Sequence, residues 1–100
     1  MRKPTKKSIN KQKLIEWAKQ VKERDGHKCI ICSRTEKLQS HHLINARYLK
    51  TRFELDNGVT LCFFCHKGSL LRSAHTGAIL FCMWLQENRK EQLERLLLSI

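Results

Sequence analysis

Apolar residues recur at intervals of three and four in the first third of the chain. The positions with this spacing are Leu14, Trp17, Ala18 and Val21. Such spacing predicts an amphipathic helix over about 13–24, which Asp25-Gly26 ends. Residues 1–11 are polar and basic, contain a proline and show no apolar periodicity, so we expect them to form a flexible arm. The remaining residues, 12–100, are expected to form one domain.

Shorter apolar segments and polar turns alternate in the middle of the chain. Residues 27–32 are expected to form a short strand, and 38–44 and about 57–61 the two arms of a β-hairpin. A polar loop over about 45–54 joins these arms. Two extended arms between helical segments predict a fold of the α+β class.

Helical periodicity returns after the hairpin. We expect a helix from Cys65 that is interrupted near 67–69, a second from about 76 to 84, and a third from about 89 to 99. The third places an apolar row on one side, formed by Leu93, Leu96, Leu97 and Ile100. Helices on both sides of the hairpin would therefore flank a small central core.

Charge changes this picture at the amino terminus. The chain carries 20 Lys and Arg against 9 Asp and Glu, a net charge of +11, and residues 1–28 alone hold ten basic and three acidic side chains. Such an uneven distribution is typical of proteins that bind a phosphate backbone, although a solubilising tail explains it equally well. No apolar run is long enough for a membrane span and no signal peptide is visible, so we expect a cytoplasmic protein with no membrane partner.

Four of the five cysteines form two C-x-x-C pairs, Cys29 with Cys32 and Cys62 with Cys65. Each pair closes a tight turn that can put two thiolates on one metal, so together they predict a four-thiolate Zn²⁺ site. Such a site has no open coordination position and contributes directly to folding, which makes its role structural. Cys82 is left over on an apolar segment and is expected to be a small core residue.

The histidines lie outside this set and are free for a second task. His41 and His42 are adjacent in a predicted strand, where neighbouring side chains face opposite sides, so one can bind a metal while the other acts as a base. An ordinary exposed pair is the alternative. Asn57 by itself is a good hairpin-turn residue. His66 can point back toward the hairpin, whereas His75 is too far along the chain to share its helical face unless the chain bends.

Together these residues resemble the HNH endonuclease family over about 21–85. The matching segments are VKERDGHKCIIC (21–32), LQSHHLI (38–44) and DNGVTLCFFCH (56–66). Within the family, Arg47 and the segment SAHTGAILFCMW (73–84) look like small HNH proteins of phages and prophages. The resemblance implies a ββα-metal core that carries the four-cysteine zinc site and is flanked by an amino-terminal helix and carboxyl-terminal helices.

The resemblance also implies a role for each residue of the site. His42 would be the general base that activates water, and Asn57 would hold the hairpin loop and so orient His42. His41 and His66 would bind a catalytic divalent metal, which is Mg²⁺, Mn²⁺ or another ion.

One position departs from the family. A further His or Asn often stands four residues after the position of His66, where this chain has Leu70. His75 is the expected substitute if the intervening chain bends back. The alternative is a two-histidine site completed by water and phosphate.

The expected activity is metal-dependent hydrolysis of DNA phosphodiester bonds. Flanking phosphates would be held by basic residues, namely the amino-terminal lysines, Arg47, Lys50, Arg52 and Lys67. Two alternatives stay open: a zinc-containing nucleic-acid-binding module whose catalytic site has decayed, and an accessory subunit that docks its leucine-rich carboxyl terminus on a larger phage DNA-processing protein. A phage-encoded protein would act in the cytoplasm of the host cell.

Overall fold

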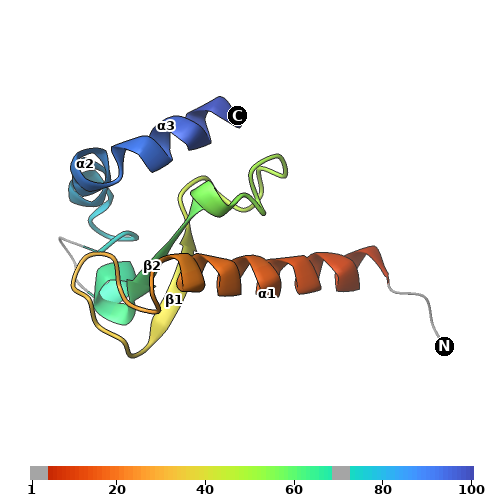
Figure 1. Cartoon of the computed structure of the whole chain (residues 1–100), viewed down its shortest axis with the longest axis horizontal. Coiled ribbons are helices and arrows are strands. Elements are labelled where there is room, and N and C mark those ends of the chain that lie inside the picture. The colour runs from red at the N-terminus through yellow and green to blue at the C-terminus, as the bar shows by residue number, and fades with distance from the viewer. Residues whose placement is uncertain (1–4, 69–72) are drawn as a thin grey trace.

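The computed structural model describes residues 5–68 and 73–100. Within these residues it is an α+β fold with a two-stranded antiparallel sheet (Figure 1). The elements in chain order are α1 (Lys6–Arg24), β1 (Leu38–His42), the 3₁₀ turn η1 (Leu55–Asn57), β2 (Gly58–Cys62), the π-helical turn η2 (Phe64–Gly68), α2 (Ala78–Asn88) and α3 (Lys90–Leu98).

Helix α1 begins at Lys6, well before the expected start. The Thr5 hydroxyl accepts a hydrogen bond from the Ser8 backbone N–H at 3.1 Å and so caps the helix. Residues 6–11, which the sequence assigned to a flexible arm, thus belong to helix α1, while residues 1–4 lie outside the described part of the chain. The cause is local, because a capping hydroxyl and good helix formers such as Lys and Gln do not require an apolar stripe.

Strands β1 and β2 form the predicted hairpin, in which His41 pairs with Val59 and His42 with Gly58. β1 ends two residues earlier than expected. The reason is that the next two backbone N–H groups donate to Asn57 instead of continuing the ladder.

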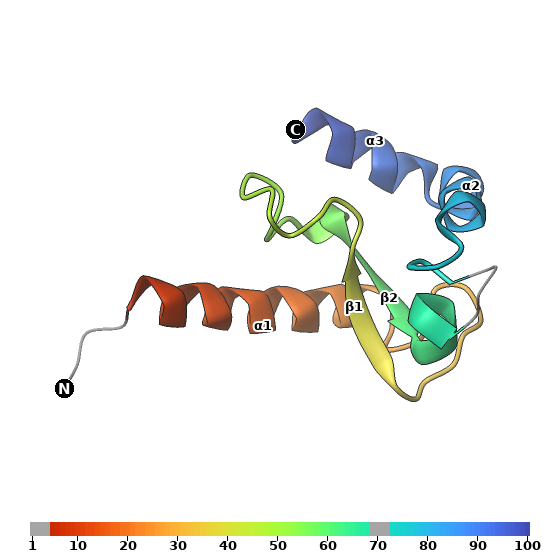
Figure 2. The ribbon, with the colours of Figure 1, turned by 180° about the vertical axis from the view of Figure 1, so that it is seen from behind.

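The two faces of the hairpin meet different helices (Figures 1 and 2). The carboxyl-terminal half of α1 covers one face so closely that a Cβ at Gly58 would lie 2.5 Å from Val21 Cγ2 and 2.6 Å from Trp17 Cζ2. Only glycine fits there. The opposite face carries the main core, which consists of Cys29, Val59, Leu61, Cys62, Ala74, Phe81 and Leu85. The hairpin is thus held from both sides, which fixes the side chains that project from β1.

The short strand expected over 27–32 is absent, because this segment is a turn. The Cys29 N–H donates to the Arg34 carbonyl at 2.8 Å, and the Ser33 N–H donates to the Cys29 carbonyl at 2.9 Å. An extended chain would hold the two cysteines of this pair apart, whereas the turn brings them to one point.

Beyond the hairpin, the helix expected from Cys65 is reduced to the short turn η2, and residues 69–72 lie outside the described part of the chain. Helix α2 begins and ends later than the predicted 76–84 segment, and α3 matches the predicted 89–99 segment closely. Among the residues described, no helix is both long and apolar enough to cross a membrane.

The apolar row of α3 is only partly buried. Leu96 is 3% exposed and packs inward, whereas Leu97 is 66% exposed and Ile100 52% exposed. The prediction that Cys82 is a core residue is wrong, because Cys82 is exposed and its neighbour Phe81 takes the inward position on α2.

A buried carboxylate ties α1 to the rest of the fold. Asp25 accepts hydrogen bonds from Arg24 (2.9 Å), from Arg89 (3.0 Å) and from the Thr60 backbone N–H (2.9 Å). Burial raises the pKa of Asp25, but these three partners outweigh it and hold the pKa below its usual value. Asp25 therefore links the end of α1, strand β2 and the junction of α2 with α3 while it is ionised.

Candidate metal centres

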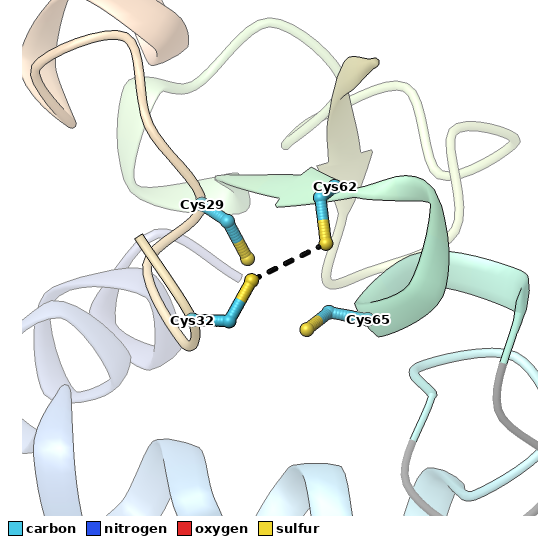
Figure 3. Close-up of side chains that lie close together, drawn as sticks. All are labelled: Cys29, Cys32, Cys62 and Cys65. Atoms are coloured by element: carbon cyan, nitrogen blue, oxygen red, sulfur yellow. Dashed lines mark hydrogen bonds between the residues drawn. The ribbon is translucent and has the colours of Figure 1, made fainter. Parts of the chain in front are cut away.

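The four paired cysteines converge on one point (Figure 3). Cys29 and Cys32 come from the turn before β1, Cys62 ends β2, and Cys65 lies in η2. Their sulfur atoms all lie within 4.8 Å of one another, and the Cys32 and Cys62 sulfurs are 3.4 Å apart. Four convergent thiolates are a ligand set that can hold a metal ion such as zinc, so the predicted gathering of these cysteines is confirmed.

The thiols of this cluster differ in the direction in which their pKa values are shifted. Burial raises the pKa of Cys62, but a hydrogen bond from the Cys65 backbone N–H and the neighbouring thiols outweigh it and lower the pKa to about 7. Burial and the charge at Cys29 raise the pKa of Cys65. Crowded thiolates repel one another, so a bound dication would favour their ionisation and its binding would release protons.

Three histidines form a second cluster on the core face of the hairpin. His41 lies on β1, His66 lies on η2, and His75 precedes α2. His66 Nε2 is 3.0 Å from His41 Nδ1 and 2.8 Å from His75 Nε2. His75 therefore joins the other two, which the sequence left open, while Leu70 lies outside the described residues.

Backbone hydrogen bonds explain how His75 reaches this cluster. The Ala74 N–H donates to the Cys65 carbonyl at 2.8 Å, and the His75 N–H donates to the His66 carbonyl at 3.1 Å. The chain thus returns alongside η2. These two bonds bring the imidazole of His75 beside that of His66.

The hydrogen bond of Gln39 orients His66. Gln39 Oε1 lies 2.5 Å from His66 Nδ1. An amide oxygen only accepts, so Nδ1 carries the proton and the lone pair of Nε2 faces His41 and His75. Metal-binding histidines are held in this way by an acceptor behind the ring. Sequence reasoning missed Gln39, although its position two residues before His41 puts both on one face of β1.

Two imidazoles of the cluster, those of His41 and His66, are neutral near pH 7. Burial, followed by the proximity of His66 and His75, lowers the pKa of His41 to about 4. Burial, His75 and Lys67 lower the pKa of His66 to about 4 as well. Neutral imidazole is the form that donates a lone pair to a metal, so the cluster is suited to a divalent cation.

His42 faces the opposite side of β1, as strand alternation predicts. Its ring stacks on Trp17 with centroids 3.9 Å apart and an interplanar angle of 9°. His42 Nε2 lies 3.0 Å from the Arg52 carbonyl oxygen. A carbonyl only accepts, so Nε2 carries the proton and Nδ1 keeps a free lone pair. Burial and the Arg52 guanidinium lower the pKa of His42, although its hydrogen bond to the carbonyl opposes them.

Asn57 holds the loop that contains this carbonyl. It is fully buried, and its Oδ1 accepts from the Ile44 N–H at 2.6 Å. Its Nδ2 donates to the carbonyls of Ile44 (3.1 Å) and Thr51 (3.0 Å). These bonds tie Ile44, where the loop begins, to Thr51, which directly precedes Arg52. Asn57 therefore does more than form a hairpin turn.

One hollow of about 530 Å³ brings His42 and the histidine cluster together. The residues that line it are Ser40, His41, His42, Leu43, Asn45, Ala46, His66, Lys67 and His75. Of the basic residues expected to contact DNA, Lys67 lies here, whereas Arg47, Lys50 and Arg52 lie on the 45–54 loop outside it. The hollow thus combines three convergent nitrogen donors, a further neutral imidazole and a cation.

No protein-family model matches this chain, and neither the curated proteins nor the solved structures compared with it gave a match. The chemistry from which a function can be argued is that of the two clusters and of the hollow between β1 and η2.

Proposed function

We propose that this chain is a metal-dependent nuclease that hydrolyses DNA phosphodiester bonds at a ββα-metal core of the HNH type. The observation that carries the proposal is the hollow in which the cluster of His41, His66 and His75 lies beside the neutral His42. A phosphodiester is hydrolysed when a base activates water while positive charge stabilises the phosphate and the leaving oxygen. Both requirements meet in one concavity.

In this mechanism His42 is the general base. Its unprotonated Nδ1 takes a proton from water, the hydroxide attacks phosphorus, and the bond from phosphorus to the 3′ oxygen breaks. The hydrogen bond from Nε2 to the Arg52 carbonyl stabilises the imidazolium that forms. Stacking on Trp17, whose indole N–H is itself fixed by a 2.8 Å bond to the Glu54 carbonyl, limits rotation of the His42 ring. Asn57 acts through the loop and is a positioning residue.

The three-histidine cluster would hold the catalytic cation. When bound there, a divalent metal supplies Lewis-acid stabilisation of the phosphate and of the leaving oxygen. His66 keeps its donor nitrogen directed at that position because Gln39 occupies its other nitrogen. Lys67 on the same hollow adds a fixed positive charge for the phosphate.

The cysteine cluster would hold a structural zinc. Structural zinc contributes an apparent ~10–16 kcal/mol in small peptides at neutral pH, which is as much as the whole stability of a small domain. Cys65 directly precedes His66, so a metal on the thiolates would also fix the start of η2 and one ligand of the second site.

A nicking assay tests the proposal. Supercoiled plasmid is incubated with zinc-loaded protein plus Mg²⁺, Mn²⁺ or no added metal. Wild type should nick the plasmid only with added metal, and His42→Ala should lose about 10²- to 10⁴-fold in rate. His27→Asn is the matched control, because His27 is an exposed histidine outside the hollow and Asn tolerates its φ of 55°.

A plasmid left intact by wild type with every metal would contradict the nuclease proposal. The chain would then be a non-catalytic nucleic-acid-binding module or an accessory subunit of a phage DNA-processing machine. Equal rates for wild type and His42→Ala would also remove His42 as the base.

A further inference from the structure

A second concavity lies between the amino-terminal half of α1 and the 45–54 loop. It measures about 430 Å³ and is referred to here as the α1 groove. The residues that line it are Lys7, Asn10, Lys11, Leu14, Ala46, Arg47, Arg52 and Phe53. Of these described residues, four are basic and none is acidic, and both α1 and the 45–54 loop contribute basic and apolar side chains.

The α1 wall of this groove has no evident role in folding. Lys7 and Lys11 stand one turn apart on the same face of the helix, about 6 Å along its axis. Like charges at this spacing destabilise a helix. Between Thr5 and Glu16, no side chain that the structure describes is buried, so packing does little to compensate. Figures 1 and 2 show this half of α1 extending beyond the hairpin. Bound anions would relieve the repulsion between the two lysines.

The α1 groove continues from the histidine-lined hollow. Ala46 lines both concavities. Arg52 connects them chemically: its Nε donates to the Ala46 carbonyl at 2.6 Å, while its own carbonyl accepts from His42. The side chain of Arg52 thus lines the groove, and its backbone faces the base proposed for catalysis.

We propose that the α1 groove binds the sugar–phosphate backbone of DNA beside the bond that is cut. Lys7 and Lys11 contact phosphates from the α1 side, Arg47 and Arg52 contact them from the loop side, and the apolar lining residues meet the sugars. The inference rests on the proposed function for the position of the scissile phosphate. Contacts of this kind carry no base sequence, so the groove positions DNA without selecting a sequence.

Salt-dependent binding tests the groove directly. Affinity of the zinc-loaded chain for a fluorescent DNA duplex is measured by anisotropy over a series of KCl concentrations, with no catalytic metal added. Each lost phosphate contact should flatten the plot of log K against log [salt] by about 0.9, so Lys7→Gln/Lys11→Gln should flatten it by about 1.8. Gln has nearly the helix propensity of Lys, and circular dichroism checks that the helix persists.

The matched control is Lys19→Gln/Lys90→Gln, which removes the same charge from two exposed lysines outside the groove. This control should keep the wild-type slope. An unchanged slope in the groove variant, or the same flattening in both double variants, would overturn the inference. Proteins that bind DNA through diffuse charge alone would give the second result.

Cleavage kinetics separate this inference from the nuclease proposal. If both hold, the groove variant should raise KM and leave kcat close to wild type, because phosphates away from the reacting bond bind equally in the ground and transition states. Wild type could bind DNA without ever cutting it, while substitution of Lys7 and Lys11 flattens the plot of log K against log [salt]. The nuclease proposal would then fail, and DNA binding by the groove would be supported. A fall in kcat with no change in KM or in the salt dependence of binding would overturn the proposal that the α1 groove binds DNA.

Discussion

Replacement of Gln39 tests the orientation of His66 without touching a metal ligand. Gln39 is exposed on β1, so its substitution removes little packing and its main effect is on the hydrogen bond to His66. Gln39→Leu removes the acceptor 2.5 Å from His66 Nδ1. The ring, only 8% exposed, must then either leave a buried N–H unpaired or move its proton to Nε2, the nitrogen that faces the cluster.

Either response weakens metal binding. An unpaired buried N–H costs about 1–3 kcal/mol, and loss of the acceptor behind a metal-bound histidine typically costs about 10- to 100-fold in affinity or activity. We expect the Mn²⁺ concentration for half-maximal nicking to rise by about 10- to 100-fold in Gln39→Leu. The rate at saturating Mn²⁺ should stay near wild type, since His42 and its partners are untouched.

Two measurements and one matched variant decide the matter. Mn²⁺ titration by calorimetry gives the affinity without any activity, and the nitrogen chemical shifts of His66 report which nitrogen is protonated. Gln39→Glu is the matched variant, because it keeps an acceptor at the same reach and should bind Mn²⁺ at least as tightly as wild type. Unchanged affinity in Gln39→Leu, or equal losses in Leu and Glu, would refute the tautomer assigned to His66.

The remaining predictions concern the zinc site, pH and metal choice. Cys62→Ser should lose the single zinc and unfold, as read by metal analysis and circular dichroism; a folded, zinc-free variant would contradict a structural site. Because the pKa of Asp25 is lowered in the folded state, its contribution to the free energy of unfolding is present above pH ~4 and is lost as the pH falls through the folded pKa. In Asp25→Asn, the free energy of unfolding measured in urea should therefore fall less steeply at acid pH. His41 and His66, with folded pKa values of about 4, should make metal-free protein less stable as pH falls from about 6.5 to 4, because the unfolded chain takes up protons first; a flat profile there would contradict burial of neutral imidazoles. Since the described cluster has imidazole donors and no carboxylate, Mn²⁺, Co²⁺ or Ni²⁺ should support faster nicking than Mg²⁺, and an equal rate with Mg²⁺ would argue against three nitrogen ligands.

Local patterns in the sequence predicted the parts of the fold that depend on local chemistry. The cysteine pairs predicted the four-thiolate cluster, and strand alternation predicted that His41 and His42 diverge. The start of α1 was missed because one capping residue, Thr5, outweighed the absence of an apolar stripe. The strand expected over 27–32 failed because convergence of two cysteines requires a turn there.

The histidines that gather at the hollow were identified from the sequence, but their geometry was not. The stacking of His42 on Trp17 joins residues 25 positions apart, and no local spacing encodes it. The position of His75 depends on two backbone bonds to the segment around His66, which periodicity does not register. Gln39 was the exception, since its place two residues before His41 on one strand was visible in the sequence.

The two clusters are physically coupled through the chain that they share. Cys65 and His66 are consecutive, and the backbone carbonyls of these two residues accept the bonds that bring Ala74 and His75 back to the site. Two of the three histidines are therefore positioned by η2, the turn that contains Cys65, while His41 is held by the hairpin. A metal bound by the cysteines would anchor η2, which is too short to persist as an isolated helix. Loss of that metal should therefore disturb the positions of His66 and His75 as well.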